Sequence, residues 1–162
     1  MHYTTETIQA HASNTNYPAT ARINNLIKVG LAELDLELGI VSHIFHRKYV
    51  VKYSNNTDLV GEVFRLGETY CSITMRLDSA RVMAIRHFAV SQYFRHPAYE
   101  HFKLETYIAT PIYVHGKQYG TLNFTKPYPR NKPFGDADKQ LMICLSDAIG
   151  QILAEKDHVA GV

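Results

Sequence analysis

Cysteine is the residue with the greatest capacity for covalent chemistry in this 162-residue sequence, which contains two, Cys71 and Cys144. Cys71 follows Tyr70 near the start of a segment expected to form a short helix, where peptide N–H groups can lower the pKa of a thiol. A nucleophilic role for Cys71 would also need a histidine or another base beside it in space. The alternative is that Cys71 is a small, buried helix residue. Cys144 lies within one turn of Met142, Leu145 and Ala148, which predicts a place in the core.

A second concentration of chemistry lies between residues 66 and 124, where hydroxyl, imidazole and amide groups accompany many aromatic rings. Pockets for small molecules are mostly apolar with a few well-aimed polar groups, which is the mixture found here. The alternative is that tyrosine and threonine are abundant because they favour strands. The residues expected to line a pocket are Tyr70, Cys71, Thr74, His87, His96, Tyr107 and Asn123. A small polar or anionic ligand is expected, with His87 or His96 holding any anion.

Charge and residue spacing disfavour several other functions. The 17 lysines and arginines exceed the 15 aspartates and glutamates by only two, too few to hold a polyanion, so no nucleic-acid partner is expected. The nine glycines match neither the dinucleotide-binding fingerprint nor the P-loop. Neither His43 with His46 nor His96 with His101 has the arrangement of a metal site. Two cysteines are too few for a disulfide framework or a structural zinc site.

The hydropathy pattern predicts no association with a membrane. The longest apolar runs extend over only a few residues, whereas a membrane-spanning helix needs about 20. The first residues lack the basic stretch and apolar run of a signal peptide. We therefore expect a cytoplasmic protein with reduced cysteines.

The elements that must position these side chains follow from the apolar periodicity. Apolar residues recur at helical spacing from 17 to about 38, with Gly39 as the expected stop, and again after Asp136 or Asp138. Strands are expected at 40–45, 49–53, 63–66, 82–85, 106–114 and 118–124, with a short helix from Thr69 to about Leu77 and a long connection at 86–104. The first two strands and the last two strands each read as a hairpin.

Strands cluster between the helices instead of alternating with them, which favours an α+β fold with an antiparallel sheet and helices packed against it. A chain of this size hides roughly 70% of its surface on folding, enough for one self-sufficient core. We expect an N-terminal arm at 1–16, a single domain at 17–156 and a C-terminal tail at 157–162.

Several of these segments together carry a family resemblance. They are 66–72 (Leu-Gly-Glu-Thr-Tyr-Cys-Ser), 95–97 (Arg-His-Pro), 104–112 (Leu-Glu-Thr-Tyr-Ile-Ala-Thr-Pro-Ile) and 114–124, which ends in Gly-Thr-Leu-Asn-Phe. Pro129-Arg130, Pro133-Phe134 and Asp138 continue the pattern into the last helix. From about Ile23 to Ala154 the chain resembles a bacterial GAF domain.

The resemblance implies a central antiparallel sheet of about six strands with helices on both sides. It places a ligand pocket on one sheet face, beneath the short helix and the long connection. GAF domains are regulatory modules of signalling proteins that bind small molecules, so the resemblance implies a non-catalytic sensor. It further implies a homodimer formed through the outer helices, and an output domain or partner protein that receives the signal. No cofactor is identified.

The sequence departs from the motifs of relatives with known ligands, and these differences narrow the choice of ligand and activity. Phe124 and Lys139 stand where cyclic-nucleotide-binding members have lysine and glutamate, and Ser72 follows Cys71 where bilin-binding members typically have histidine. Free-methionine-sulfoxide reductases of this fold use several cysteines, whereas only Cys71 is a candidate here. Two alternatives to a sensor stay open: a thiol-dependent reductase of that type, and a structural dimerisation module whose pocket is filled by side chains.

Overall fold

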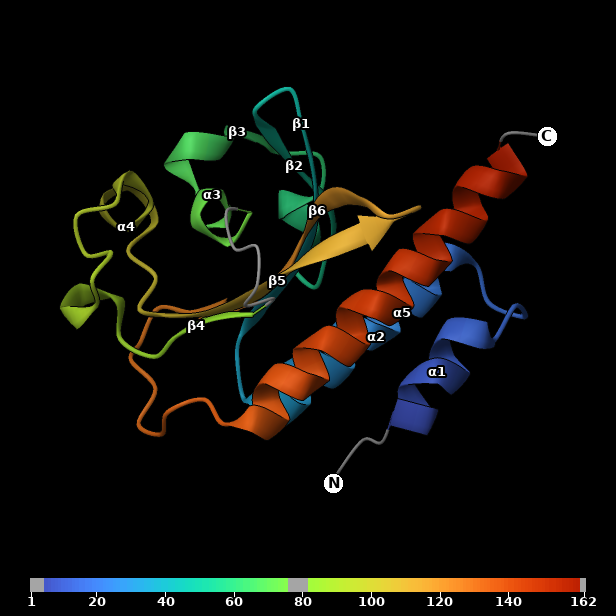
Figure 1. Cartoon of the computed structure of the whole chain (residues 1–162), viewed down its shortest axis with the longest axis horizontal. Coiled ribbons are helices and arrows are strands. Elements are labelled where there is room, and N and C mark those ends of the chain that lie inside the picture. Colours follow the sequence, from blue (N-terminus) through green and yellow to red (C-terminus); the bar gives the residue numbers. More distant parts are fainter. Residues whose placement is uncertain (1–4, 76–81, 161–162) are drawn as a thin grey trace.

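A six-stranded antiparallel sheet separates two layers of helices (Figure 1). The computed structural model describes the backbone of residues 5–75 and 82–160 and the side chains of residues 5–75, 82–99 and 102–156. The strands are β1 (Leu38–Phe45), β2 (Lys48–Ser54), β3 (Val63–Arg65), β4 (Met83–Ile85), β5 (Thr106–Val114) and β6 (Lys117–Lys126). Their order across the sheet is β3-β2-β1-β6-β5-β4. The predicted α+β class and antiparallel sheet are therefore confirmed.

Two tight hairpins build most of this sheet. The turn between β1 and β2 places His46 and Arg47 at φ 50° and 60°, and the turn between β5 and β6 places His115 and Gly116 at φ 52° and 76°. Consecutive residues with positive φ twist the chain in the sense that two antiparallel strands require. Both hairpins predicted from the sequence are present, and β1 pairs with β6 to join them.

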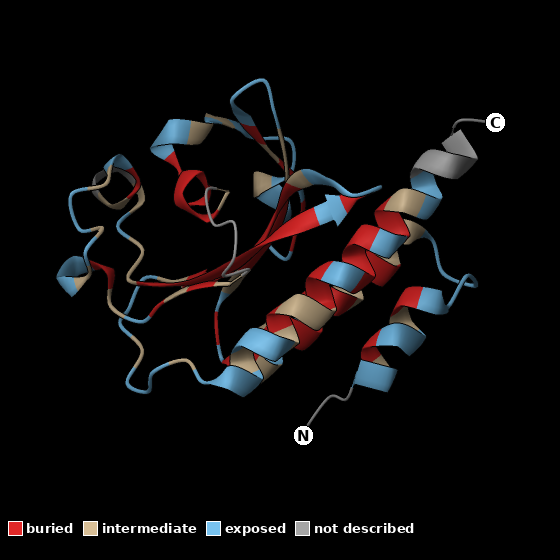
Figure 2. Ribbon diagram, in the orientation of Figure 1, coloured by how far each residue is buried: buried red, intermediate tan, exposed pale blue. Residues whose placement is uncertain are grey.

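Three longer helices cover one face of the sheet: α1 (Thr5–Ser13), α2 (Ala19–Leu34) and α5 (Asp136–Ala160). Figure 1 shows α2 and α5 lying side by side against the strands, with α1 on the outside. The apolar residues of all three helices join those of the sheet in one core, and the buried residues lie along the inner faces of the helices (Figure 2). The segment 1–16 is expected to be an arm, but its residues Ile8 and Ala12 belong to this core.

The end of α2 differs from the expectation that Gly39 stops this helix. The helix ends at Leu34, and Asp35 caps it in the left-handed conformation with φ 54°. Gly39 instead lies in β1 opposite Phe124 of β6. A side chain at Gly39 would collide with Ile27 and with the ring of Phe124, so its lack of a Cβ serves the close approach of helix and sheet.

Short helices cover the opposite face of the sheet (Figure 1). They are η1 (Thr57–Leu59), η2 (Leu66–Glu68), α3 (Cys71–Thr74), η3 (Phe88–Val90) and α4 (Pro97–Phe102). The short helix predicted from Thr69 is the four-residue α3, and Leu77 lies outside the described residues. A second apolar core fills the space between these helices and the sheet. Helices therefore lie on both sides of the sheet, as predicted.

Candidate functional site

A cavity of about 130 Å³ lies between the sheet and the short helices. Its floor is formed by β1, β2, β5 and β6, and its roof by residues of η1, β3, α3, α4 and their connections. The lining residues are Leu38, Ile40, Tyr49, Val51, Leu59, Phe64, Thr69, Tyr70, Cys71, Phe102, Leu104, Tyr107, Asn123 and Thr125.

Strand alternation explains which floor residues face the cavity. Asn123 of β6 pairs with Ile40 of β1, and Thr125 pairs with both Leu38 and Tyr107, so residues of one parity on each strand share the cavity face. Their neighbours of the opposite parity face the long helices instead.

The hairpin from β1 to β2 contributes through an irregularity in its pairing. Val41 pairs with Tyr53 and the next residue, Ser42, pairs with Val51, so Lys52 is an extra residue in β2. This bulge reverses the side on which β2 presents its side chains. Tyr53 joins the core beneath the long helices, whereas Tyr49 and Val51 face the cavity.

Polar side chains converge on Cys71 at one wall of the cavity. The Cys71 Sγ atom lies 3.0 Å from Thr121 Oγ1 and 3.2 Å from the Tyr107 hydroxyl, and it accepts from Asn123 Nδ2 at 3.4 Å. Thr121 Oγ1 also lies 2.8 Å from Ser42 Oγ. The group joins α3 to three strands of the sheet, and its members are all buried and contact one another.

Two further hydrogen bonds hold the tyrosine rings of the cavity. Asn123 Nδ2 donates to the Tyr49 hydroxyl at 3.1 Å, and the Tyr107 hydroxyl lies 2.9 Å from Thr74 Oγ1. Thr74 Oγ1 has a second contact, to Met83 Sδ of β4 at 3.4 Å. Thr74 therefore holds the hydroxyl of Tyr107, and the rings of Tyr49 and Tyr107 keep a fixed orientation toward the cavity.

The ionisable groups of the wall are held in their neutral forms. Burial raises the pKa of the Cys71 thiol, although hydrogen bonds from Thr121 and Tyr107 oppose the shift. Burial also raises the pKa of Tyr49 and of Tyr107 well above the ordinary value for tyrosine. The residues that line the cavity in the described part of the chain include no lysine, arginine, histidine, aspartate or glutamate. The cavity is therefore uncharged at neutral pH.

One hydroxyl at the floor of the cavity has no hydrogen-bond partner. Thr125 is only 2% exposed, and its Oγ1 atom is buried without a partner. A buried polar group left unpaired costs about 1–3 kcal/mol, so such groups are rare in folded proteins. Thr125 lines the cavity while its Oγ1 is covered, so a rotation about the Cα–Cβ bond would bring this hydroxyl into contact with a bound molecule.

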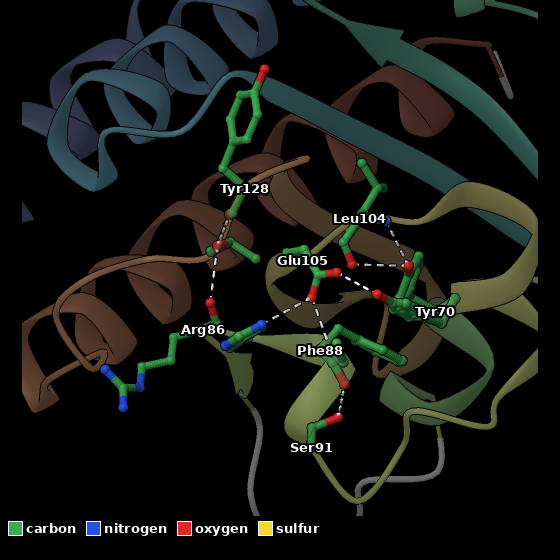
Figure 3. Close-up of polar contacts among 11 residues, drawn as sticks. Tyr70, Arg86, Phe88, Ser91, Leu104, Glu105 and Tyr128 are labelled. Atoms are coloured by element: carbon green, nitrogen blue, oxygen red, sulfur yellow. Dashed lines mark hydrogen bonds and ion pairs between the residues drawn. The ribbon is translucent and has the colours of Figure 1, made fainter.

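The roof is fastened to the start of β5 by hydrogen bonds that Figure 3 shows. The Tyr70 hydroxyl accepts from Leu104 N and donates to Leu104 O, both at 3.0 Å. Burial raises the pKa of Tyr70 to about 12, against the effect of the Leu104 peptide. The neighbouring Glu105 carboxylate accepts hydrogen bonds from the Ala89 amide at 2.9 Å and from the Tyr99 hydroxyl.

The structure brings together four of the seven residues predicted to line a pocket. Tyr70, Cys71, Tyr107 and Asn123 all line the cavity. The other three predicted residues are Thr74, His87 and His96, and none of them lines the cavity. Thr74 instead contacts the hydroxyl of Tyr107.

Both histidines lie outside the lining of the cavity. His87 Nε2 lies 3.8 Å from Glu105 Oε1, at the outer side of the roof. His96 caps α4, because its Nδ1 accepts from Ala98 N at 3.0 Å, and its Nε2 lies 3.0 Å from Ser72 Oγ. His96 therefore joins α4 to α3, whereas His87 lies beside the segment that precedes β5.

Sequence reasoning missed the contribution of the first hairpin. Much of the floor comes from Leu38, Ile40, Tyr49 and Val51, whereas the predicted lining lies entirely between residues 66 and 124. The alternation of residues 38 and 40 was a usable signal once β1 was paired with β6, whereas the side on which 49 and 51 lie depends on the bulge in β2. The bulge in β2 was not visible in the sequence.

Other kinds of site are not found in the described part of the chain. No group of three or more histidine, cysteine, aspartate or glutamate side chains among the described residues is arranged to hold a metal ion. Within the same residues, no helix combines the length and apolar character needed to cross a bilayer.

Comparisons with solved structures show which proteins share this architecture. The GAF domain of the phosphoenolpyruvate-protein phosphotransferase from Acinetobacter matches with a TM-score of 0.74 and 12% identity, over 100% of both chains. The phycoerythrobilin-bound GAF domain of a cyanobacterial phytochrome matches with a TM-score of 0.78 and 12% identity, again over 100% of both chains. Free methionine-R-sulfoxide reductase from Neisseria meningitidis, in complex with its substrate, matches with a TM-score of 0.72 and 11% identity, over 95% of this chain and 89% of that chain.

At these identities the neighbours establish the fold alone. The comparison with curated proteins found no match. The family model of the GAF domain, in contrast, matches residues 26–153, which is most of the sequence and includes the whole sheet. By this match and by its architecture, the chain belongs to the GAF domain family.

Proposed function

We propose that this chain is a non-catalytic sensory module of the cytoplasm that binds a small molecule in the cavity beneath α3 and α4. The observation that carries the proposal is the cavity itself, which has a mostly apolar lining and a buried, unpartnered hydroxyl at its floor. Binding pockets for small molecules combine an apolar lining with a few polar groups in this way. A cavity of this kind also counts against a purely structural module whose pocket is filled by side chains.

Strand β6 supports a route from the cavity to the long helices. Asn123 and Thr125 face the cavity, whereas Phe124 between them is fully buried against α2 on the other side of the sheet. A ligand that moves β6 would therefore also move a side chain packed in the helix layer. Ligand binding can shift an equilibrium between two helix packings only if the ligand prefers one of them.

We further propose that the helix layer passes the signal on, in a homodimer, to an output domain or a partner protein. Among the neighbours, one GAF domain comes from a phosphotransferase and another from a phytochrome. Such parents support a module that works as part of a larger signalling assembly.

A thiol-dependent reductase is the alternative function that the fold neighbours bring forward. Reduction of a sulfoxide by a thiol needs a reactive thiolate and a second thiol to resolve the oxidised sulfur. Burial raises the pKa of Cys71, so the thiol stays protonated at neutral pH. The second cysteine, Cys144, lies in α5 on the opposite side of the sheet. Both facts favour the sensor.

The decisive experiment is a thermal-shift screen of the purified protein against small-molecule libraries, with a variant that fills the cavity as its control. A ligand at 100 times its Kd stabilises the folded state by about 2.7 kcal/mol, which raises the Tm of a chain of this size by about 5–10 °C. Val51→Phe places a larger side chain in the cavity and should abolish the shift while leaving the circular dichroism spectrum unchanged. A shift that persists in Val51→Phe would place the ligand elsewhere.

A reactivity assay separates the sensor from the reductase. Cys71 is buried and Cys144 is partly exposed, so iodoacetamide at pH 8 should label Cys144 first. The protein incubated with free methionine sulfoxide and dithiothreitol should produce no methionine above the level without protein. Preferential labelling of Cys71 together with turnover would establish the reductase.

A further inference from the structure

We infer that the ligand of this cavity is an uncharged molecule with a single aromatic ring and one hydrogen-bonding group, which contacts Thr125 Oγ1. The inference rests on the proposed function and names the chemical class that the site takes. Four properties carry it: the absence of charge in the described lining, the volume, the arrangement of the aromatic walls and the unpartnered hydroxyl.

The electrostatics of the wall select an uncharged ligand. An ion in an apolar site loses its hydration and needs an opposite charge or several hydrogen bonds in return. The described lining offers neither a cation nor an anion. The two histidines predicted to hold an anion do not belong to this lining, because His87 lies beside Glu105 and His96 caps α4. The expected role of these histidines in holding an anion is therefore not available at this cavity.

The size of the cavity selects a small ring. Its volume of about 130 Å³ is close to that of an engineered apolar protein cavity of about 150 Å³, which binds benzene. A linear tetrapyrrole, such as the bilin bound to one of the structural neighbours, is far larger. Free methionine sulfoxide is smaller but carries two charges at neutral pH. The bilin is therefore excluded by its size, and methionine sulfoxide by its charges.

Aromatic side chains form much of the enclosure. The rings of Tyr70 and Tyr107 stack with centroids 5.1 Å apart, and Phe64 meets Phe102 edge to face at 5.5 Å. Tyr49 is tilted against Phe64 at 6.2 Å. Aromatic pairs gain about 0.5–1.5 kcal/mol beyond the burial of their surface, so a ring inserted among these five is favoured over an aliphatic group of the same size.

Thr125 is the polar group of the cavity that is still available to a ligand. The Cys71 thiol, the Asn123 amide nitrogen and the Tyr107 hydroxyl already contact one another or their neighbours. Thr125 Oγ1 has no such partner. A second unpartnered hydroxyl, that of Thr110, lies on β5 among residues that face the long helices, so it provides a matched control on the other side of the sheet.

The test compares benzene, phenol and benzoate, which share a ring and differ only in the polar group. Dissociation constants for the wild-type protein would be measured by titration in one buffer at neutral pH, with chemical-shift changes in an NMR spectrum as the readout. We expect phenol to bind about fivefold more tightly than benzene, because of one additional hydrogen bond. Benzoate should bind at least about a hundredfold more weakly than phenol, because its charge has no partner.

Two variants test the anchor. Thr125→Val removes the hydroxyl at nearly constant volume and should reduce the affinity for phenol to that for benzene, while leaving the affinity for benzene unchanged. Thr110→Val removes the other unpartnered hydroxyl and should change neither affinity. Equal loss of phenol binding in both variants, or no loss in Thr125→Val, would overturn the assignment of Thr125.

The comparison of the three compounds on the wild-type protein does not depend on either variant folding. If benzoate binds as tightly as phenol or more tightly, the inference of an uncharged ligand is wrong, and the proposed small-molecule site is retained. If none of the three binds while the library screen yields a ligand that Val51→Phe excludes, the ligand class is again wrong and the sensor stands. If neither experiment finds a ligand, both proposals fail.

Discussion

The substitution Gly30→Ala tests how tightly the helix layer is joined to the strand that forms the cavity floor. Gly30 lies in α2, where alanine is normally the better helix former by about 0.5–1 kcal/mol. A Cβ atom at this position would lie 2.2 Å from Cζ of Phe124, whereas ordinary contact begins at 3.4 Å. The ring has little room to withdraw, because Gly39 of β1 approaches it so closely that a Cβ there would lie 2.8 Å from Cε1.

The magnitude follows from these two opposing effects. Forcing an extra carbon into a close-packed core costs about 1–3 kcal/mol. After the gain in helix propensity, we expect Gly30→Ala to lower the free energy of unfolding by about 1–2 kcal/mol. For a chain of this size, that corresponds to a Tm lower by about 2–8 °C. Helix propensity alone predicts the opposite sign.

Thermal and urea unfolding followed by circular dichroism would measure the effect. Gly67→Ala serves as the control, because a Cβ there meets open space, and its stability should stay within about 0.5 kcal/mol of the wild type. Phe124→Leu should partly rescue Gly30→Ala, so that the double variant is more stable than the sum of the single effects by about 1 kcal/mol. A Gly30→Ala protein as stable as the wild type would refute the close contact between α2 and β6.

Two further predictions concern the buried hydroxyl groups around the cavity. Tyr107→Phe removes a group that contacts both Cys71 and Thr74, and it should lower the free energy of unfolding by about 1–2 kcal/mol in urea titrations, whereas Tyr128→Phe at an exposed position should change little. Stability should also fall as the pH rises from about 9 toward 12, because the unfolded chain releases the protons of Cys71, Tyr107 and Tyr70 at lower pH than the folded chain does. Urea midpoints that stay constant across this range would contradict the burial of these groups, and the decline should be shallower in Tyr107→Phe.

The sequence allowed the sheet to be predicted because the signals for its strands are local. Alternation and turn residues identify the two hairpins, and the concentration of polar and aromatic residues between 66 and 124 predicted that Tyr107, Cys71 and Asn123 line one pocket. The end of α2 was misplaced because a glycine after a helix is an ordinary stop signal, whereas here Asp35 adopts the left-handed conformation and Gly39 serves the packing of Phe124.

The positions of His87 and His96 could not be predicted from the local sequence. His87 and His96 occur in a segment rich in aromatic residues, and nothing in the spacing distinguishes an imidazole that faces a cavity from one that ties a roof together. The distinction depends on Glu105 and Ser72, which are distant in sequence from their imidazole partners. Sequence alternation could have placed Tyr49 on the cavity side only if the extra residue in β2 had been known.

One physical property, the exclusion of water from the wall around Cys71, connects the two functions considered for this chain. A thiol that attacks a sulfoxide must ionise, and ionisation requires water, a cation or an aligned helix end nearby. Cys71 is the first residue of α3, but that helix has only four residues. Burial removes the water, and the contacts of the thiol come instead from Thr121, Tyr107 and Asn123, which are neutral groups. The same burial makes the cavity favourable for an uncharged ring. A change that let the thiol ionise, such as a lysine at Val51, would therefore weaken the binding of a neutral ligand, so this wall cannot be well suited to both tasks at once.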